Sequence, residues 1–308
     1  MAVPANTKLT YSNLTNPEFV DDMIKFISPD DAPFYNGISK ANVNATKPEW
    51  LTDTYEATGT NAQLEGDDFA AASFTDPARV SNNTQILAKR FQVSGTQRAI
   101  KSYAVEDTFG YQALKKTKEL IRDFETAISS NQAPNVGAAG TARQLRPLES
   151  FYATNVSMGV GGANGTATTA RTDGTLRSLA LGFITTVMQS CYTNGGTPNK
   201  LVAAPSIVVA IGALAGTAQR QVKASEVTAY ADYIATPFGN LMVVPSRYVR
   251  TRTAHLVDMS TKKIGKLRDI KREELAKSGD SHRMQIIGEM TIYEKAEHGN
   301  GIIADIQP

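Results

Sequence analysis

The chain has 308 residues and a formal net charge of +2, with 32 basic and 30 acidic side chains. This length corresponds to two domains or one large one, enough to bury a sizeable core. A single cysteine, Cys191, excludes an intramolecular disulfide and any zinc or iron–sulfur site that needs several thiolates. Proline and glycine interrupt the longest apolar stretch, residues 201–218, and the N-terminus lacks a basic and apolar leader. We therefore expect a soluble protein without a transmembrane helix or a signal peptide.

The charge is unevenly distributed along the chain. Residues 1–76 contain four basic and twelve acidic side chains, a net −8, so the rest of the chain carries +10. Residues 247–283 contain eleven basic and five acidic side chains. Such clusters can bind nucleic-acid phosphates, or they can form a solvated face or meet the acidic part of a neighbouring copy. Because no nucleic-acid motif or set of stacking aromatic residues accompanies the charge, we favour the second interpretation.

The first 40 residues contain four prolines and little apolar patterning. Within them, residues 17–27 (PEFVDDMIKFI) predict one short amphipathic helix with Pro17 in its first turn. Its apolar face, which includes Phe19 and Phe26, cannot be buried within so short a segment. We therefore expect this segment to dock on the body of the protein or on another chain.

Residues 43–100 have the composition of strands joined by polar, glycine-containing segments. Trp50–Tyr55 and Gln85–Val93 are rich in β-favouring residues, and the segment between them is too polar to form a core. This pattern predicts a long extended β-hairpin with an acidic outgoing limb and a basic returning limb. Because an isolated two-stranded ribbon is marginally stable in water, we expect the hairpin to lie on another surface.

The strongest helical pattern covers residues Ser102–Ile128, which contain no proline. Apolar residues recur there at spacings of three and four, which predicts a long amphipathic helix of about 40 Å. We expect Ser102 to cap its start. The predicted buried stripe consists of Val105, Phe109, Ala113, Leu120, Ile121, Phe124 and Ile128.

The rest of the chain mixes shorter helices and strands. A helix is predicted from Gly174 to Thr193, with Asp173 as N-cap, a stripe from Leu176 to Cys191 facing the core, and a stop at the glycines 195 and 196. Cys191 is therefore interpreted as a core thiol. A short strand at Lys200–Ala203 precedes a third helix, which starts near Pro205 and ends within residues 216–220.

The last third is predicted to be rich in strands. The predicted strands are residues 227–235, 241–244, 255–259, 264–267, 284–293 and 301–306. Thr236–Asn240 supplies the turn of a hairpin, and Leu275–Ser281 a polar turn between two strands. Because helices and strands do not alternate regularly, we expect the α+β class.

No catalytic or ligand-binding motif stands out. The glycine-rich run at residues 159–170 (GVGGANGTATTA) lacks the third glycine and the Lys-Ser/Thr pair of phosphate-binding loops. The histidines His255, His282 and His298 are isolated from metal-ligand partners, and neither Ser39 nor Ser206 lies in a nucleophile elbow. We expect no enzyme activity, no catalytic residue, no cofactor and no metal.

Three segments nevertheless resemble a known family. They are residues 26–40 (FISPDDAPFYNGISK), residues 233–249 (YIATPFGNLMVVPSRYV) and residues 255–302 (HLVDMSTKKIGKLRDIKREELAKSGDSHRMQIIGEMTIYEKAEHGNGI). They are similar to the major capsid protein family typified by phage SU-ten, one branch of the tailed-bacteriophage capsid proteins with the Hong Kong 97-type fold. The resemblance covers nearly the whole chain and is weakest in residues 131–173.

The resemblance implies a domain organisation. Residues 1–42 would form an N-terminal arm and residues 43–101 the extended hairpin called the E-loop. A peripheral (P) domain would include residues 102–170, with its spine helix at 102–130. Residues 171–255 would form most of the axial (A) domain, and residues 256–308 would return to the P domain and supply the C-terminal strands.

The resemblance also implies a function. The protein would assemble into hexamers and pentamers of an icosahedral shell around double-stranded DNA, which it would contact non-specifically. A portal, a separate scaffolding protein and an optional cement or decoration protein would be its partners, and shells would form in the host cytoplasm. Candidate contacts between subunits are Phe19, Phe26, Trp50, Tyr55, Phe69, Phe74, Arg79, Lys89 and Arg90. The alternatives are an encapsulin-like non-viral shell and a basic nucleic-acid-binding protein.

Overall fold

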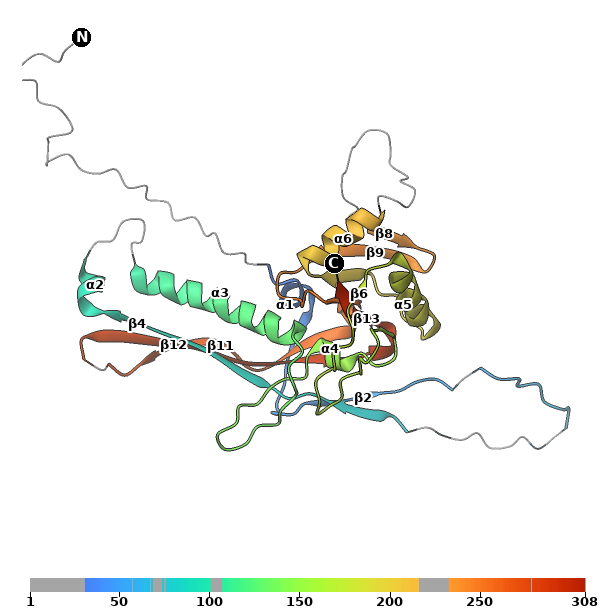
Figure 1. Cartoon of the computed structure of the whole chain (residues 1–308). Helices are drawn as coiled ribbons and strands as arrows, with labels where there is room; N and C mark the ends of the chain where they lie inside the picture. The colour runs from blue at the N-terminus through green and yellow to red at the C-terminus, as the bar shows by residue number, and fades with distance from the viewer. Residues whose placement is uncertain are drawn as a thin grey trace, which may run out of the picture.

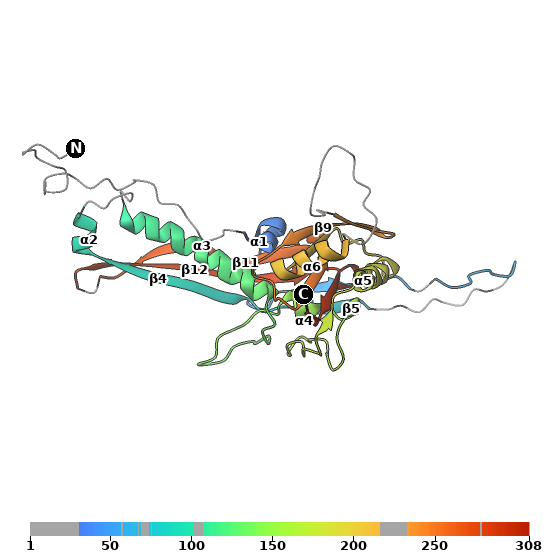
Figure 2. The same ribbon diagram turned by 45° about the horizontal axis from the view of Figure 1, so that its top comes forward.

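The computed structural model describes residues 31–56, 58–66, 68, 74, 76–100, 107–215, 233–277 and 279–307. Its secondary structure combines helices with mainly antiparallel sheets, which confirms the α+β prediction. An elongated part carries a long helix on long strands, and a compact part lies at one end of it (Figure 1). Figure 2, turned by 45° from Figure 1, shows the same elongated shape. Within the described residues, no helix combines the length and apolarity needed to cross a membrane.

A four-stranded sheet forms the floor of the elongated part, in the order β1-β11-β12-β4. Its strands are β1 (Ser39–Asn42), β4 (Gln85–Ser94), β11 (Lys262–Leu275) and β12 (Ser281–Glu294). The two 14-residue strands β11 and β12 pair antiparallel around the polar turn that the sequence predicted. The structure therefore extends the expected strands 264–267 and 284–293 in both directions.

The long helix α3 (Thr108–Ser129) lies on one face of this sheet and contacts β4 and β12. Asp107 caps its start, because its carboxylate accepts the N–H groups of Phe109 and Gly110 at 3.0 and 3.1 Å. This corrects the prediction of Ser102 as the cap, and residues 102–106, with Val105, lie outside the described part. The apolar stripe is confirmed except at Ile121, which is only partly buried; its buried members are Phe109, Ala113, Leu120, Phe124 and Ile128.

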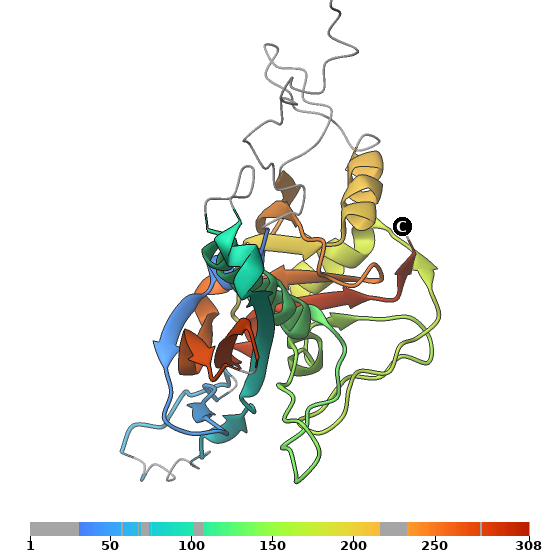
Figure 3. The same ribbon diagram turned by 90° about the vertical axis from the view of Figure 1, so that its left-hand side faces the viewer.

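The compact part is built on a six-stranded sheet in the order β5-β13-β10-β7-β9-β8. Its strands are β5 (Val156–Ser157), β7 (Lys200–Ala203), β8 (Tyr233–Thr236), β9 (Gly239–Pro245), β10 (Thr253–Val257) and β13 (Gly301–Ala304). Two helices, α5 (Leu181–Thr193) and α6 (Pro205–Ala215), pack against it in one apolar cluster. Seen from the far end of the long sheet, the two parts lie side by side (Figure 3).

Helix α5 begins later than the sequence predicted. Its N-cap position is Ala180, whereas Asp173 forms ion pairs with Arg250 and Arg252. Leu176, expected in the buried stripe, is 48% exposed. The predicted stop is confirmed, since Gly195 follows the helix with a φ of 83°.

Smaller elements complete the described chain. They are α1 (Pro33–Gly37), β2 (Glu49–Thr52), β3 (Ala78–Ser81), α2 (Gly95–Ala99), α4 (Leu148–Phe151), β6 (Arg177–Ser178), η2 (Met259–Thr261), η3 (Glu297–Gly299) and β14 (Ile306–Gln307). Strands β14 and β6 form a short parallel pair, and β2 and β3 a short antiparallel pair. One apolar cluster joins α1, α3 and the long sheet to the near face of the six-stranded sheet.

The extended hairpin differs from its prediction in its returning limb. Strand β2 pairs with β3, with Trp50 opposite Val80, so the limb beside the acidic strand is β3. Residues Gln85–Val93, expected as that limb, instead form most of β4, which pairs along its whole length with β12. The prediction failed because β-favouring composition identifies a strand but not its partner. The boundaries of the arm and of the P and A domains stay predictions.

Candidate assembly surfaces

The base of the hairpin is fixed to the body by Trp50. The indole Nε1–H of Trp50 donates to the carbonyl of Glu294 at 2.9 Å. The indole packs against Tyr293 and Phe151, with ring centroids 4.7 and 6.1 Å apart. Trp50, predicted as a contact between subunits, therefore makes its described contacts within its own chain.

Beyond β2 and β3 the hairpin projects from the body (Figure 1). Tyr55 and Phe74 are almost completely exposed, at 103% and 96%, and Leu51 and Leu64 are also exposed. Apolar side chains concentrated on a projecting segment are typical of a surface that binds a second molecule. Tyr55 and Phe74 are thus the predicted contact residues that the structure leaves free to meet another chain.

The charges on the hairpin are mostly acidic. Between Glu49 and Asp76 the sequence has seven carboxylates and no cation. At its base, the exposed Arg79 guanidinium lies 3.3 Å from Glu49, and the Lys47 ammonium lies 3.9 Å from it. These exposed pairs add little stability because water screens them.

Two other predicted contact residues lie away from the hairpin. On β4, Lys89 Nζ lies 2.5 Å from the Asp123 carboxylate of α3, and Arg90 donates to Gln285 of β12 at 3.1 Å. The structure thus places them on the long sheet, with partners in the same chain. Phe19, Phe26 and Phe69, as well as the helix predicted at residues 17–27, lie outside the described residues.

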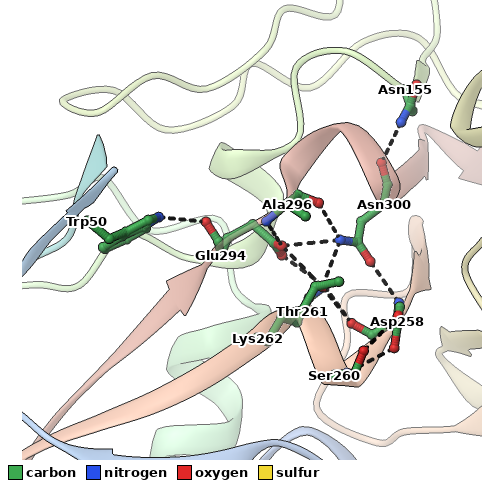
Figure 4. A network of polar contacts seen from close by, with 9 residues as sticks. All are labelled: Trp50, Asn155, Asp258, Ser260, Thr261, Lys262, Glu294, Ala296 and Asn300. Atoms are coloured by element: carbon green, nitrogen blue, oxygen red, sulfur yellow. Dashed lines mark hydrogen bonds and ion pairs between the residues drawn. The ribbon is translucent and has the colours of Figure 1, made fainter. Parts of the chain in front are cut away.

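A buried polar network joins the long sheet to the compact part (Figure 4). At its centre, Lys262 Nζ lies 2.8 Å from Glu294 Oε2, and both side chains are completely buried. Asn300 donates to Glu294 Oε1 at 3.1 Å and accepts the Asp258 N–H at 2.7 Å. Burial lowers the pKa of Lys262 and raises the pKa of Glu294, so desolvation outweighs the ion pair for both groups.

No sequence pattern singled out this network. Its members occur in the segment at residues 255–302 that carries the family resemblance, so the motif was visible although its role was not. The sequence signal that could have indicated the network is a lysine at the start of one long strand and a glutamate at the end of the next. The strand register places Lys262 directly opposite Glu294.

A second network explains the glycine-rich run. The carboxylate of Asp305 accepts the N–H groups of Gly159 and Gly174, each at 3.0 Å, and pairs with Arg252 at 2.6 Å. A Cβ on Gly159 would lie 2.0 Å from the carbonyl oxygen of Thr175. The run therefore serves close backbone packing around a buried carboxylate.

The histidines and the cysteine are placed differently. His255 is completely buried, and burial, with Lys262, Arg171 and Arg250 nearby, lowers its pKa to about 3. Burial raises the pKa of the Cys191 thiol to about 12, as expected of a core residue. Among the residues that the structure describes, no group of three His, Cys, Asp or Glu side chains could hold a metal ion.

The arrangement of a long helix on a long sheet, a projecting hairpin and a compact sheet domain is that of the Hong Kong 97-type capsid fold. A chain of the cyanophage A-1(L) capsid asymmetric unit matches with a TM-score of 0.67, covering 95% of this chain and 98% of that one at 14% identity. A chain of Microbacterium phage Oxtober96 matches with a TM-score of 0.65, covering 96% and 97% at 13% identity. The holo-SrpI encapsulin complex of Synechococcus elongatus PCC 7942 matches with 0.58, covering 96% and 93% at 8% identity. At these identities the likeness shows the fold alone.

The sequence is more specific than the fold. The SU10 major capsid protein family matches residues 3–307, and the chain belongs to this family. It is also 36% identical over 111 residues to the major capsid protein of Escherichia phage Phieco32. That alignment covers 36% of this chain and 32% of the relative, so the chain matches about a third of that relative's length.

Proposed function

We propose that the protein assembles into hexamers and pentamers of an icosahedral shell that encloses the double-stranded DNA genome of a tailed phage. The observation that carries this proposal is the projecting hairpin, whose exposed Tyr55 and Phe74 have no core of their own to enter. Burying them on a neighbouring copy would remove apolar surface from water. Membership of a major capsid protein family supports the same role.

Charge complementarity would be a second contribution to the association of subunits. The acidic hairpin would meet basic surface on a neighbouring copy, and such exposed charges attract less at high salt. Phe19, Phe26, Phe69, Arg79, Lys89 and Arg90 stay candidates for the same contacts. The near-neutral whole chain would tolerate packaged DNA without reading its sequence.

The proposal includes partners and a location. We expect a portal, a separate scaffolding protein and, on some shells, a cement protein, with assembly in the host cytoplasm and the mature protein in the virion. Co-expression tests the scaffold, because equal yields of closed shells with and without it would contradict that requirement. Nothing in this role asks for catalysis or a cofactor.

Sedimentation velocity of the purified protein at low and high salt tests the proposal, with negative-stain imaging of the fastest fraction. Closed particles or discrete hexamers and pentamers are the expected result. A monomer or dimer at every salt concentration, even with scaffolding protein supplied, would contradict it. Shells that enclose protein cargo and never DNA would favour the encapsulin-like alternative, which shares the fold. Tight, salt-sensitive nucleic-acid binding without particles would favour the other alternative, a basic nucleic-acid-binding protein.

A further inference from the structure

One corner of the six-stranded sheet is left open by the described helices. Tyr233 of β8 and Met242 of β9 lie directly opposite each other, and they are 61% and 41% exposed. Leu241, the neighbour of Met242, is completely buried in the cluster with α5 and α6. Because successive side chains of a strand point to opposite faces, Tyr233 and Met242 lie on the face away from these two helices.

A lysine completes this exposed surface. The strand register places Lys200 of β7 on the other side of Met242, so that Lys200, Met242 and Tyr233 form one row across three strands. Lys200 has no carboxylate partner among the residues that the structure describes. We call this row the corner patch. It presents two large apolar side chains and one positive charge.

The corner patch borders the place where the chain enters the body. Helix α1 lies beside it, because the Lys200 ammonium is 4.0 Å from the position that a Cβ on Gly37 would take. Glu125 of α3 holds α1 there, since its carboxylate oxygens accept the N–H groups of Phe34 and Tyr35 at 2.9 and 2.8 Å. The first described residues are therefore fixed next to the corner patch.

The length of the chain before α1 suits this position. Asp31 pairs with Arg247 at 3.2 Å, and Arg247 follows Met242 by five residues, which span at most about 18 Å. The four peptide units between Ile27 and Asp31 can span about 14 Å, and the helix predicted at residues 17–27 would add about 16 Å along its axis. That segment can therefore lie across the corner patch of its own chain.

The chemistry of the segment suits the corner patch as well. An amphipathic helix needs a surface on which to bury its apolar face. The apolar residues of that predicted face are Phe19, Met23, Phe26 and Ile27. The segment also carries three carboxylates and one lysine, a net charge of −2, which is opposite in sign to the charge of Lys200. Burying the apolar face on Tyr233 and Met242 would remove apolar surface from water on both sides.

We propose that residues 17–27 dock as a helix on the corner patch of their own chain, with Met23 over Met242 and the acidic side chains towards Lys200. The contact goes beyond shell assembly and does not depend on it, because both surfaces belong to one chain and can meet in a dissociated subunit. Phe19 and Phe26, candidate contacts between subunits, are thereby assigned to a contact within the subunit.

Disulfide trapping in the full-length protein tests the contact, at a concentration at which subunits stay dissociated. Met23→Cys/Met242→Cys should form a disulfide within one chain, because docking brings the two Cα atoms within about 7 Å. Peptide mapping by mass spectrometry identifies the bond, and a non-reducing gel separates bonds within a chain from bonds between chains. The native Cys191 is completely buried, so it does not compete.

Met23→Cys/Val160→Cys is the matched control. Val160 is 87% exposed and follows β5, which lies at the opposite edge of the six-stranded sheet from β8. Equal disulfide yields in the two variants, or no bond in Met23→Cys/Met242→Cys, would overturn the proposal. Bonds that form only between chains would also overturn it, and would return the segment to contacts between subunits.

Hydrogen exchange covers the case in which a cysteine variant does not fold. Amides of residues 17–27 should be protected in the unsubstituted subunit, because a docked helix keeps its backbone hydrogen bonds closed. Met242→Ser should lower this protection about tenfold, since it removes a large apolar contact. Val209→Ser, at a residue 60% exposed on α6 and thus on the other face of the sheet, should leave it unchanged. An unprotected segment, or equal effects of the two substitutions, would show that the docking is wrong.

Discussion

Lys262 and Glu294 form a completely buried ion pair, 2.8 Å from Nζ to Oε2, where β11 begins and β12 ends. Removing one member of such a pair leaves an uncompensated charge away from water. We expect Lys262→Met to lower the free energy of unfolding by about 3–5 kcal/mol. The double variant Lys262→Met/Glu294→Gln, which keeps an acceptor for Asn300, should recover most of that loss. Urea unfolding of the three proteins measures both effects, and equal losses in the single and double variants would contradict this interpretation.

The buried histidine predicts an acid-sensitive fold. The pKa of His255 is lowered to about 3, so the folded state disfavours its protonated form. A base with a depressed pKa stabilises the fold above its unfolded pKa of 6.5, and this stability is lost as the pH falls below that value. The contribution of His255 to this loss should be about 2 kcal/mol from pH 7 to pH 5. Unfolding of His255→Met at both values should show a smaller loss than the unsubstituted protein. Identical losses would mean that another group controls this range.

Trp50 predicts a contribution to stability within the subunit. Trp50→Phe keeps most of the contact with Tyr293 but removes the hydrogen bond to the Glu294 carbonyl. We expect a loss of about 1 kcal/mol in the free energy of unfolding of the dissociated subunit. Chemical denaturation below the assembly concentration measures it. An unchanged value would show that water replaces the indole donor without cost.

The exposed aromatic residues of the hairpin are predicted to affect assembly and not the stability of the single subunit. Tyr55→Ser and Phe74→Ser should change subunit stability by less than about 0.5 kcal/mol, because these side chains touch little of their own chain. They should nevertheless reduce the yield of closed particles in sedimentation experiments. Val160→Ser, at a residue 87% exposed on a loop outside the hairpin, is the control. Full particle yields in all three variants would exclude these rings from assembly.

The acidic hairpin predicts a salt effect on association. Raising the ionic strength from 0.1 M to 1 M shortens the screening length from about 10 Å to about 3 Å, which weakens attraction between exposed charges. Association of unsubstituted subunits should therefore fall with salt. The variant Asp53→Asn/Glu56→Gln should associate more weakly at low salt and respond less to added salt. A salt response that matches the unsubstituted protein would locate the relevant charges elsewhere.

Local pattern was a good guide to elements and a poor guide to their partners. The long helix predicted at residues 102–128 appears as α3 at residues 108–129, and the polar turn predicted at Leu275–Ser281 lies between β11 and β12. The β-favouring run at Gln85–Val93 is also a strand, but it pairs with β12 and not with the acidic limb. Likewise, Asp173 has the residue type of a helix cap, yet Arg250 and Arg252 bind it.

The sequence by itself determined the class of the fold, the long helix, most strands and, through the segment at residues 255–302, the family. These features depend on periodicity and short motifs, which are formed by residues near each other in the chain. Only the tertiary structure decided that Lys262 meets Glu294, that Glu125 caps α1, and that Tyr55 and Phe74 stay exposed while Trp50 does not. These outcomes depend on which distant segments pack together, because burial and hydrogen-bond partners are properties of the packed chain.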